Sequence, residues 1–150
     1  MAPSRQTVMF DVTRQRFRVT VTTAFIRQPK SWESLADSVM KMTQNQATEV
    51  RYAASADEIS DEPGVVHVVV MELAGAADYA IEIYWAGMCD MPSDTVGMHI
   101  ACSINADVLV TADDDSPRSW WLLSPNGVLR AVDLDVEELE RSNRVVYQIE

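Results

Sequence analysis

The residues of this chain that could do chemistry gather just after its middle. His99 and Cys102 lie three positions apart in a stretch with helical periodicity, and Cys89 and Asp90 come shortly before them. Histidine and cysteine at that spacing can share one helix face and could bind a metal ion or form a nucleophile with its base. A structural zinc site needs four such ligands, and the other histidine, His67, lies in a predicted strand. We therefore expect no metal ion, cofactor or catalytic residue here.

A second candidate is the run of three aspartates, Asp113, Asp114 and Asp115, which follows a predicted strand. Clustered carboxylates suit divalent cations, but an EF-hand loop needs glycine at its sixth position and glutamate at its twelfth. Arg118 and Ser124 occupy those positions, so the calcium-binding pattern fails. A solvated turn is the simplest interpretation of the aspartates, and a contact patch for a basic partner is the second.

Other catalytic patterns are incomplete. Ser93, Asp94 and His99 supply the residue types of a hydrolytic triad, but without the nucleophile-elbow motif. The five glycines are scattered, which argues against a phosphate-binding loop. We expect a protein that is not an enzyme, and we keep as an alternative a small metal-dependent hydrolase that uses the acidic turn and His99.

Charge is the strongest global signal in the sequence. The chain has 12 basic and 23 acidic residues and a net charge of −11. The charge is unevenly distributed, because the first 30 residues contain six basic residues and a single acidic one, Asp11. A negative field of this size disfavours nucleic acid and anionic membranes, and it speeds encounter with a basic partner. Asp57, Glu58, Asp61 and Glu62 lie together in one predicted loop and form a second candidate contact patch.

Length and composition are those of one globular domain with its own core, since 150 residues are 47% hydrophobic. Two cysteines are too few for a disulfide scaffold, which favours a reducing compartment. The sequence shows neither a secretory signal nor the ~20 apolar residues of a membrane helix. We expect a soluble cytoplasmic protein.

Hydrophobic periodicity predicts the elements that must position these residues. Apolar residues recur at three- and four-residue spacing over residues 31–42 and 92–104, and both stretches predict helices. Asp135 and Glu138 form a capping box that opens a third, shorter helix. Alternation with period two and apolar runs predict strands at residues 7–11, 16–23, 49–53, 65–73, 78–85, 107–110, 119–124, 128–132 and 144–149.

The order of these elements predicts an α+β fold. The segment Pro125-Asn126-Gly127 predicts the turn of a hairpin between residues 119–124 and 128–132, because Asn-Gly is a common hairpin signal whose two positions tolerate positive φ. Several hairpins alternate with helices, so we expect an antiparallel or mixed sheet with two to three helices packed on it. Trp120 and Trp121 are consecutive strand residues, so one should face the core while the other is exposed as an apolar anchor beside the acidic turn.

The stretch VLVTADDDSPRSWWLLSPNGVLRAVDLDVEELE, residues 108–140, resembles the C-terminal part of immunity proteins from bacterial polymorphic-toxin systems. The shared features are a strand, an acidic turn, a tryptophan-containing hairpin and a short acidic helix. The resemblance implies an acidic, cytoplasmic, non-enzymatic protein that occludes the active site of a cognate toxin. The expected partner-binding residues are Asp57, Glu58, Asp61, Glu62, Asp113, Asp114, Asp115, Trp120 and Trp121.

Two further alternatives involve binding rather than catalysis. An acidic nucleic-acid mimic would inhibit a DNA- or RNA-binding protein, with carboxylates spaced like phosphates and strong salt dependence. Self-association would bring the basic N-terminal hairpin of one copy against an acidic face of another, since the first 30 residues carry a net charge of +5 and the remaining 120 a net charge of −16.

Overall fold

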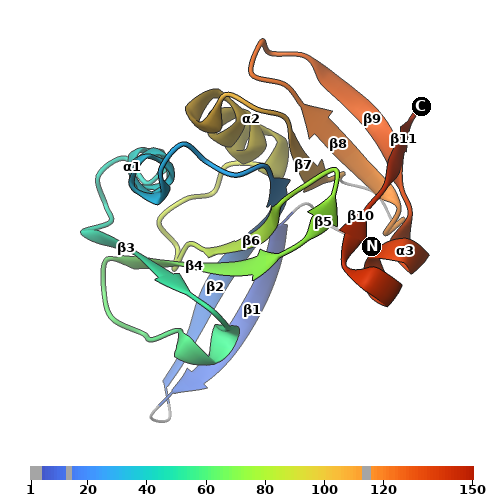
Figure 1. Ribbon diagram of the computed structural model, residues 1–150. Coiled ribbons are helices and arrows are strands. Elements are labelled where there is room, and N and C mark those ends of the chain that lie inside the picture. The colour runs from blue at the N-terminus through green and yellow to red at the C-terminus, as the bar shows by residue number, and fades with distance from the viewer. Residues whose placement is uncertain (1–4, 13–14, 113–115) are drawn as a thin grey trace.

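The computed structural model describes residues 5–12, 15–112 and 116–150, with side chains described from Thr20 onward. The described elements form an α+β fold, as predicted (Figure 1). In chain order they are β1 (Arg5–Val12), β2 (Gln15–Ile26), α1 (Trp32–Met42), β3 (Glu49–Ala53), the 3₁₀ helix η1 (Ala56–Glu58), β4 (Val65–Glu72), β5 (Ala74–Gly75), β6 (Tyr79–Tyr84), α2 (Ser93–Ile104), β7 (Val108–Thr111), β8 (Ser119–Leu123), β9 (Leu129–Leu134), α3 (Val136–Ser142), β10 (Arg144–Val145) and β11 (Tyr147–Ile149).

Within the described ranges, nine strands form one mixed sheet along the path β11-β9-β8-β7-β2-β6-β4-β3, with β1 paired to β2. The long strand β2 organises the centre of this sheet. One of its edges pairs with β6, while β1 and β7 pair with successive parts of the strand. Strands β3 and β4 are parallel, and the other pairs in this sheet are antiparallel. Strands β3 and β11 are therefore the two ends of the sheet path.

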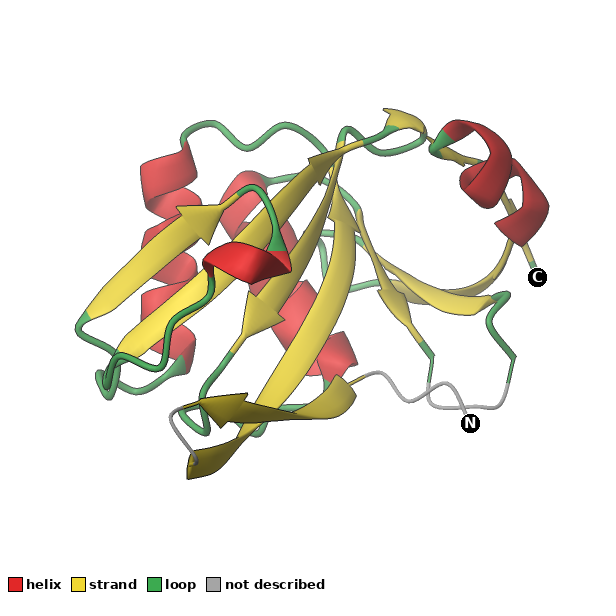
Figure 2. Ribbon diagram, turned by 90° about the horizontal axis from the view of Figure 1, so that it is seen from below, coloured by secondary structure: helices red, strands yellow, loops and turns green. Residues whose placement is uncertain are grey.

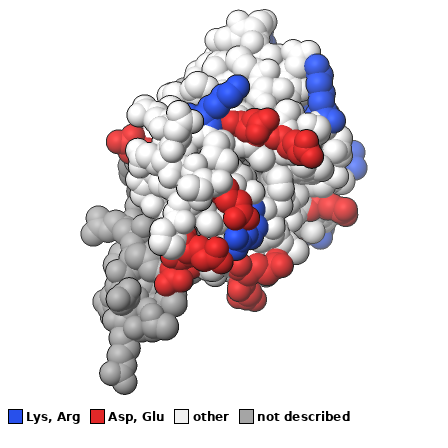
Figure 3. Space-filling model, turned by 90° about the vertical axis from the view of Figure 1, so that its left-hand side faces the viewer, with Lys and Arg blue, Asp and Glu red and all other residues white. Residues whose placement is uncertain are grey.

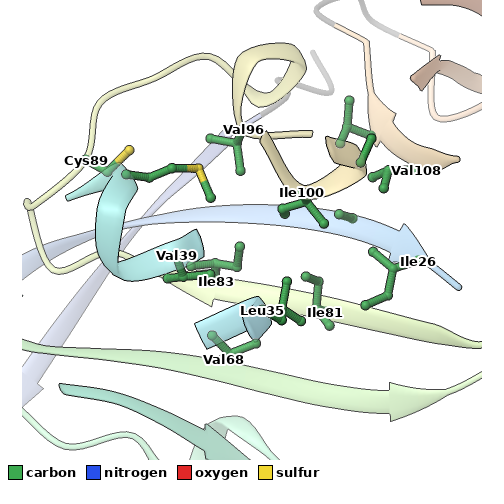
Figure 4. Packing of buried hydrophobic residues seen from close by; sticks show 14 of the residues in the cluster. Ile26, Leu35, Val39, Val68, Ile81, Ile83, Cys89, Val96, Ile100 and Val108 are labelled. Atoms are coloured by element: carbon green, nitrogen blue, oxygen red, sulfur yellow. The ribbon is translucent and has the colours of Figure 1, made fainter. Parts of the chain in front are cut away.

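Helices α1 and α2 cover one face of the sheet and enclose the main hydrophobic core (Figures 1 and 4). Helix α1 begins at Ser31, whose side-chain oxygen accepts a hydrogen bond from the Ser34 amide at 3.0 Å. Such a cap satisfies one of the amides that a helix N-terminus leaves without a partner. The helical stripes predicted from sequence are confirmed, because their apolar residues are buried against the sheet: Leu35, Val39, Met42, Val96, Ile100 and Ile104.

The opposite face of the sheet is covered as well, by different elements. Helix α3 and the short β5–β10 pair lie at the end of the sheet formed by β9 and β11 (Figure 2). Trp120 stacks on Phe25 in this second core, with ring centroids 4.4 Å apart. As a result β6 is buried on both sides: Ala80 and Ile81 are consecutive residues, and they belong to the two different cores.

Trp85, which follows β6, is the largest of the fully buried side chains. Its indole nitrogen donates a hydrogen bond to the Thr22 hydroxyl at 2.8 Å, and Thr22 is itself fully buried. A buried donor without a partner costs about 1–3 kcal/mol, so this bond allows a polar ring atom to lie in the core.

The hairpin turn predicted at Pro125-Asn126-Gly127 is confirmed, because the Ser124 amide donates to the Val128 carbonyl and the Gly127 amide to the Ser124 carbonyl, which leaves these three residues as the loop between β8 and β9. In this turn only Gly127 has a positive φ, of 89°. One strand was missed: residues 74–77, which lie between the predicted strands 65–73 and 78–85, contain β5, which pairs in parallel with β10. A sequence gives no local sign of a two-residue strand whose partner lies about 70 residues away along the chain.

Gly97 allows α2 to pack closely on the sheet, and its substitution tests this packing. An added Cβ would lie 2.3 Å from Leu123 Cδ1 and 2.8 Å from Val110 Cγ1. Alanine gains about 1 kcal/mol of helix propensity over glycine, but overpacking a core costs about 1–3 kcal/mol. Because both contacts are far inside van der Waals distance, the overpacking cost should be about 2–3 kcal/mol, so we expect Gly97→Ala to lower the free energy of unfolding in urea by roughly 1–2 kcal/mol. The exposed control Thr95→Ala should change it by less than about 0.5 kcal/mol.

Candidate partner-binding site

The candidate site is the connection between β3 and β4, residues 54–64, which we call the acidic loop. It contains four of the acidic residues predicted to bind a partner, Asp57, Glu58, Asp61 and Glu62, and all four are exposed. The side of the molecule on which α1, β3 and this loop lie carries several acidic side chains, interspersed with a few basic ones (Figure 3). The structure thus brings together the first of the two patches expected from sequence.

The acidic loop is held by hydrogen bonds at both ends. At its start, the Glu58 carboxylate accepts hydrogen bonds from the amides of Ala54, at 2.5 Å, and Ser55, at 3.0 Å. At its end, the Thr48 amide donates to the Gly64 carbonyl at 2.7 Å, and Gly64 has a φ of 78° that favours glycine. These contacts give the loop a defined conformation although it contains only one turn of 3₁₀ helix.

Arg51 fixes two of the surrounding carboxylates. Its guanidinium donates two hydrogen bonds to Glu49, at 2.9 and 3.0 Å, and two to Glu62, at 3.1 and 3.2 Å. Both pairs have the bidentate geometry that suits the planar guanidinium. The hydrogen bonds from Arg51 lower the pKa of Glu49 and that of Glu62, so both carboxylates remain charged well into the acidic range.

The remaining acids of the loop are available to a partner. Asp57 and Asp61 have no hydrogen-bond or ion-pair partner in the described part of the chain, and both side chains are exposed. From Glu49 to Glu62 the segment carries five carboxylates against Arg51 alone, which leaves a net charge of −4. The arrangement is suited to attracting a cationic surface over a distance of about one Debye length, roughly 8–10 Å in physiological salt.

His67 lies under the acidic loop, and sequence reasoning placed it in a strand without a role. The side chain is only 2% exposed, and its Nε2 atom accepts a hydrogen bond from the Ser60 amide at 3.4 Å. Burial lowers the pKa of His67, and the adjacent Arg51 lowers it further. Arg51 and His67 are neighbours because β3 and β4 pair in parallel, a register that the sequence alone does not reveal.

The second predicted patch cannot be assembled in the same way. Asp113, Asp114 and Asp115 lie outside the described residues. Trp120 is only 7% exposed and donates from its ring nitrogen to the Pro117 carbonyl at 3.0 Å, so it does not offer a surface anchor. Trp121 is half-buried against the main core, on the other face of β8. Strand β8, which carries both tryptophans, is the fifth strand from β3 along the sheet path, roughly 24 Å away at the usual strand spacing. The tryptophans and the acidic loop therefore do not form one patch.

The residues considered for catalysis do not form one site. Ser93 is fully buried whereas His99 is exposed, so they do not face a common space as a triad would. Cys89 is buried, and the exposed Cys102 thiol contacts the Pro125 carbonyl at 3.7 Å. Among the described residues there is no group of three or more histidine, cysteine, aspartate or glutamate side chains placed to hold a metal ion.

Comparison with known proteins adds no relative. The chain matches no protein-family model, and neither a curated protein nor a solved structure is detectably similar to it. In the ranges that the structure describes, no helix combines the length and the apolar composition needed to cross a bilayer. The interpretation of the site therefore depends on its own geometry and charge.

The buried His67 predicts a pH dependence of stability. Its pKa in the folded protein is lower than the ordinary value of 6.5, because burial and Arg51 disfavour the charged ring. The stability that comes from the neutral ring is present in full above pH 6.5 and is lost as the pH falls through the folded-state pKa. Urea unfolding at about pH 7.5 and about pH 5.5 should show a smaller loss of stability in His67→Gln than in the wild type.

His99→Gln is the matched control for this experiment, because His99 is the other histidine and its side chain is exposed. This variant should keep the pH dependence of the wild type. An unchanged loss of stability between the two pH values in His67→Gln would contradict the assignment to the buried ring.

Proposed function

We propose that this chain is a cytoplasmic, non-enzymatic inhibitor that binds a partner with a basic surface, as an immunity protein binds its cognate bacterial toxin. The observation that carries this proposal is the exposed acidic loop, in which Arg51 fixes Glu62 and backbone amides fix Glu58, while Asp57 and Asp61 stay without a partner among the described residues. A fixed set of charges loses little conformational entropy on binding and can present one defined pattern to the partner. The resemblance of residues 108–140 to immunity proteins supports the same class of function.

An apolar group lies in the same region and could anchor the interface. Met71 is 46% exposed and belongs to the face of β4 that also carries Val69. Val69 is in the small core against which Ile59 of the acidic loop packs. Methionine is a flexible apolar side chain that is common at adaptable binding surfaces. An apolar anchor with charged residues around it is the usual composition of a strong contact region.

The size of the protein is compatible with such an interface. A typical complex buries about 800 Å² on each partner. The accessible surface of the chain is 8197 Å², so an interface of this size would use about a tenth of it. The acidic charges would mainly raise the association rate, while buried apolar groups such as Met71 would slow dissociation.

Neutralising the two unpaired carboxylates tests the proposal. The wild-type protein and the double variant Asp57→Asn/Asp61→Asn would be used to capture partners from the cells that produce the chain, in low salt and in about 0.5 M salt. We expect a single stoichiometric partner that stops growth when expressed alone and is harmless when the chain is co-expressed. Its association rate at low salt should fall roughly tenfold in the double variant.

The double variant Asp107→Asn/Glu140→Gln is the control, because it removes the same amount of charge from two exposed residues outside the acidic loop. It should bind the partner nearly as fast as the wild type. Equal binding by both double variants would overturn the role of the acidic loop. Capture of nucleic-acid-processing proteins that dissociate in salt would favour the nucleic-acid mimic, and no captured partner in either buffer would refute the inhibitor function.

A further inference from the structure

Strand β11 lies at the end of the sheet opposite β3 and the acidic loop (Figure 1). A groove runs along its free edge. It has a volume of about 680 Å³. The groove is lined by the end of β5 with the next residue and by the C-terminal strand: Gly75, Ala76 and residues 144–149. Two of these side chains are among the exposed large hydrophobic residues of the protein, Val146 at 40% and Ile149 at 55%.

The backbone of β11 offers hydrogen-bonding groups to this groove. The Val146 carbonyl accepts from Asp135, and the Glu150 amide donates to Ala131, so residues 146, 148 and 150 bond toward β9. Successive residues of a strand point their amides and carbonyls to opposite edges. The amides and carbonyls of Tyr147 and Ile149 therefore point away from β9, toward the side on which β5 pairs with the preceding residues.

The two ends of the sheet differ in how they are protected against added strands. At β3, Glu49 and Arg51 form ion pairs along the edge, and charged side chains are a common means of preventing edge pairing. At β11 the side chains are Tyr147, Gln148 and Ile149, which carry no charge. Protein sheets usually cover an edge of this kind.

We propose that the β11 edge is a self-association surface, on which the β11 strand of a second copy pairs in the antiparallel direction. In this arrangement Tyr147 pairs with Ile149 of the second copy, and Ile149 pairs with Tyr147 of the second copy. The amides and carbonyls of both residues, which face the groove, would then all be hydrogen-bonded. Such an interface is isologous, because the same two residues exchange roles about a two-fold axis. The exposed Ile149 side chain would lie opposite Tyr147, whose ring packs partly against the second core.

Charge complementarity identifies the occupant as a second copy. In this register Glu150 of one copy lies opposite Val146 of the second copy. Arg144 of the second copy is then the diagonal neighbour of Glu150 on the same face, at a distance that a long side chain can span. Within one copy Arg144 and Glu150 are six residues apart in an extended segment, roughly 20 Å, so they cannot pair with each other. The edge therefore carries both halves of an ion pair that forms only between copies.

This surface is independent of the proposed function, because β11 and β3 lie at opposite ends of the sheet. A dimer formed through β11 would leave both acidic loops accessible. Three residues per strand make a small contact, so we expect a weak dimer, with a dissociation constant above about 10 μM.

Sedimentation of the full chain over a range from about 10 μM to about 1 mM tests the proposal. We expect dimers at the upper end, and concentration-dependent protection of the Tyr147 and Ile149 amides from hydrogen exchange. Ile149→Lys should raise the dissociation constant at least roughly tenfold. Val128→Lys is the control, since Val128 is 40% exposed but does not line the groove, and it should dimerise like the wild type.

A charge exchange distinguishes this register from other contacts. Arg144→Glu alone should weaken the dimer, and the double variant Arg144→Glu/Glu150→Arg should restore it, because the ion pair is then re-formed between copies with reversed sign. Urea unfolding would verify that each variant is folded. A wild-type chain that stays monomeric up to about 1 mM, or a dimer that persists in Ile149→Lys, would overturn the proposal.

Discussion

The burial of both faces of the central strands is the constraint on which the rest of the structure depends. Because Ala80 and Ile81 of β6 lie in different cores, the sheet requires two separate covers. Helices α1 and α2 supply one of them. On the other face α3 and the β5–β10 pair cover one end, and the acidic loop contributes Ile59 to the small core around Val69 and Tyr84. The charged loop therefore has an apolar underside that positions it on the sheet.

The polar contacts of the acidic loop determine its geometry more than the stability of the fold. Exposed ion pairs such as those of Arg51 with Glu49 and Glu62 contribute little net free energy, because water solvates the separated charges well. They do restrict the side chains to one arrangement. Glu49 and Glu62 are in this way organised around a single guanidinium, and His67 is buried next to it with a lowered pKa that favours the neutral ring.

The helices and nearly all of the strands could be predicted from the sequence, because each has a local periodicity that a single stretch of chain displays. The features that failed depend on distant partners. Alternation places Trp120 and Trp121 on opposite faces of β8, but it cannot show that both faces are covered. The grouping of acids in the loop was visible as a cluster in the sequence, whereas the contact between Arg51 and His67 follows from parallel pairing of two strands.

The position of β2 has a consequence for how the chain is made. Its partners β6 and β7 begin about 60 and 90 residues after it begins, and the second core needs β10, near the other end of the sequence. Contacts of such separation carry a large loop-closure cost and are formed late. During synthesis on the ribosome, β2 would remain without these neighbours until most of the chain has emerged. Its apolar residues, Phe25 and Ile26 among them, would meanwhile be open to chaperones.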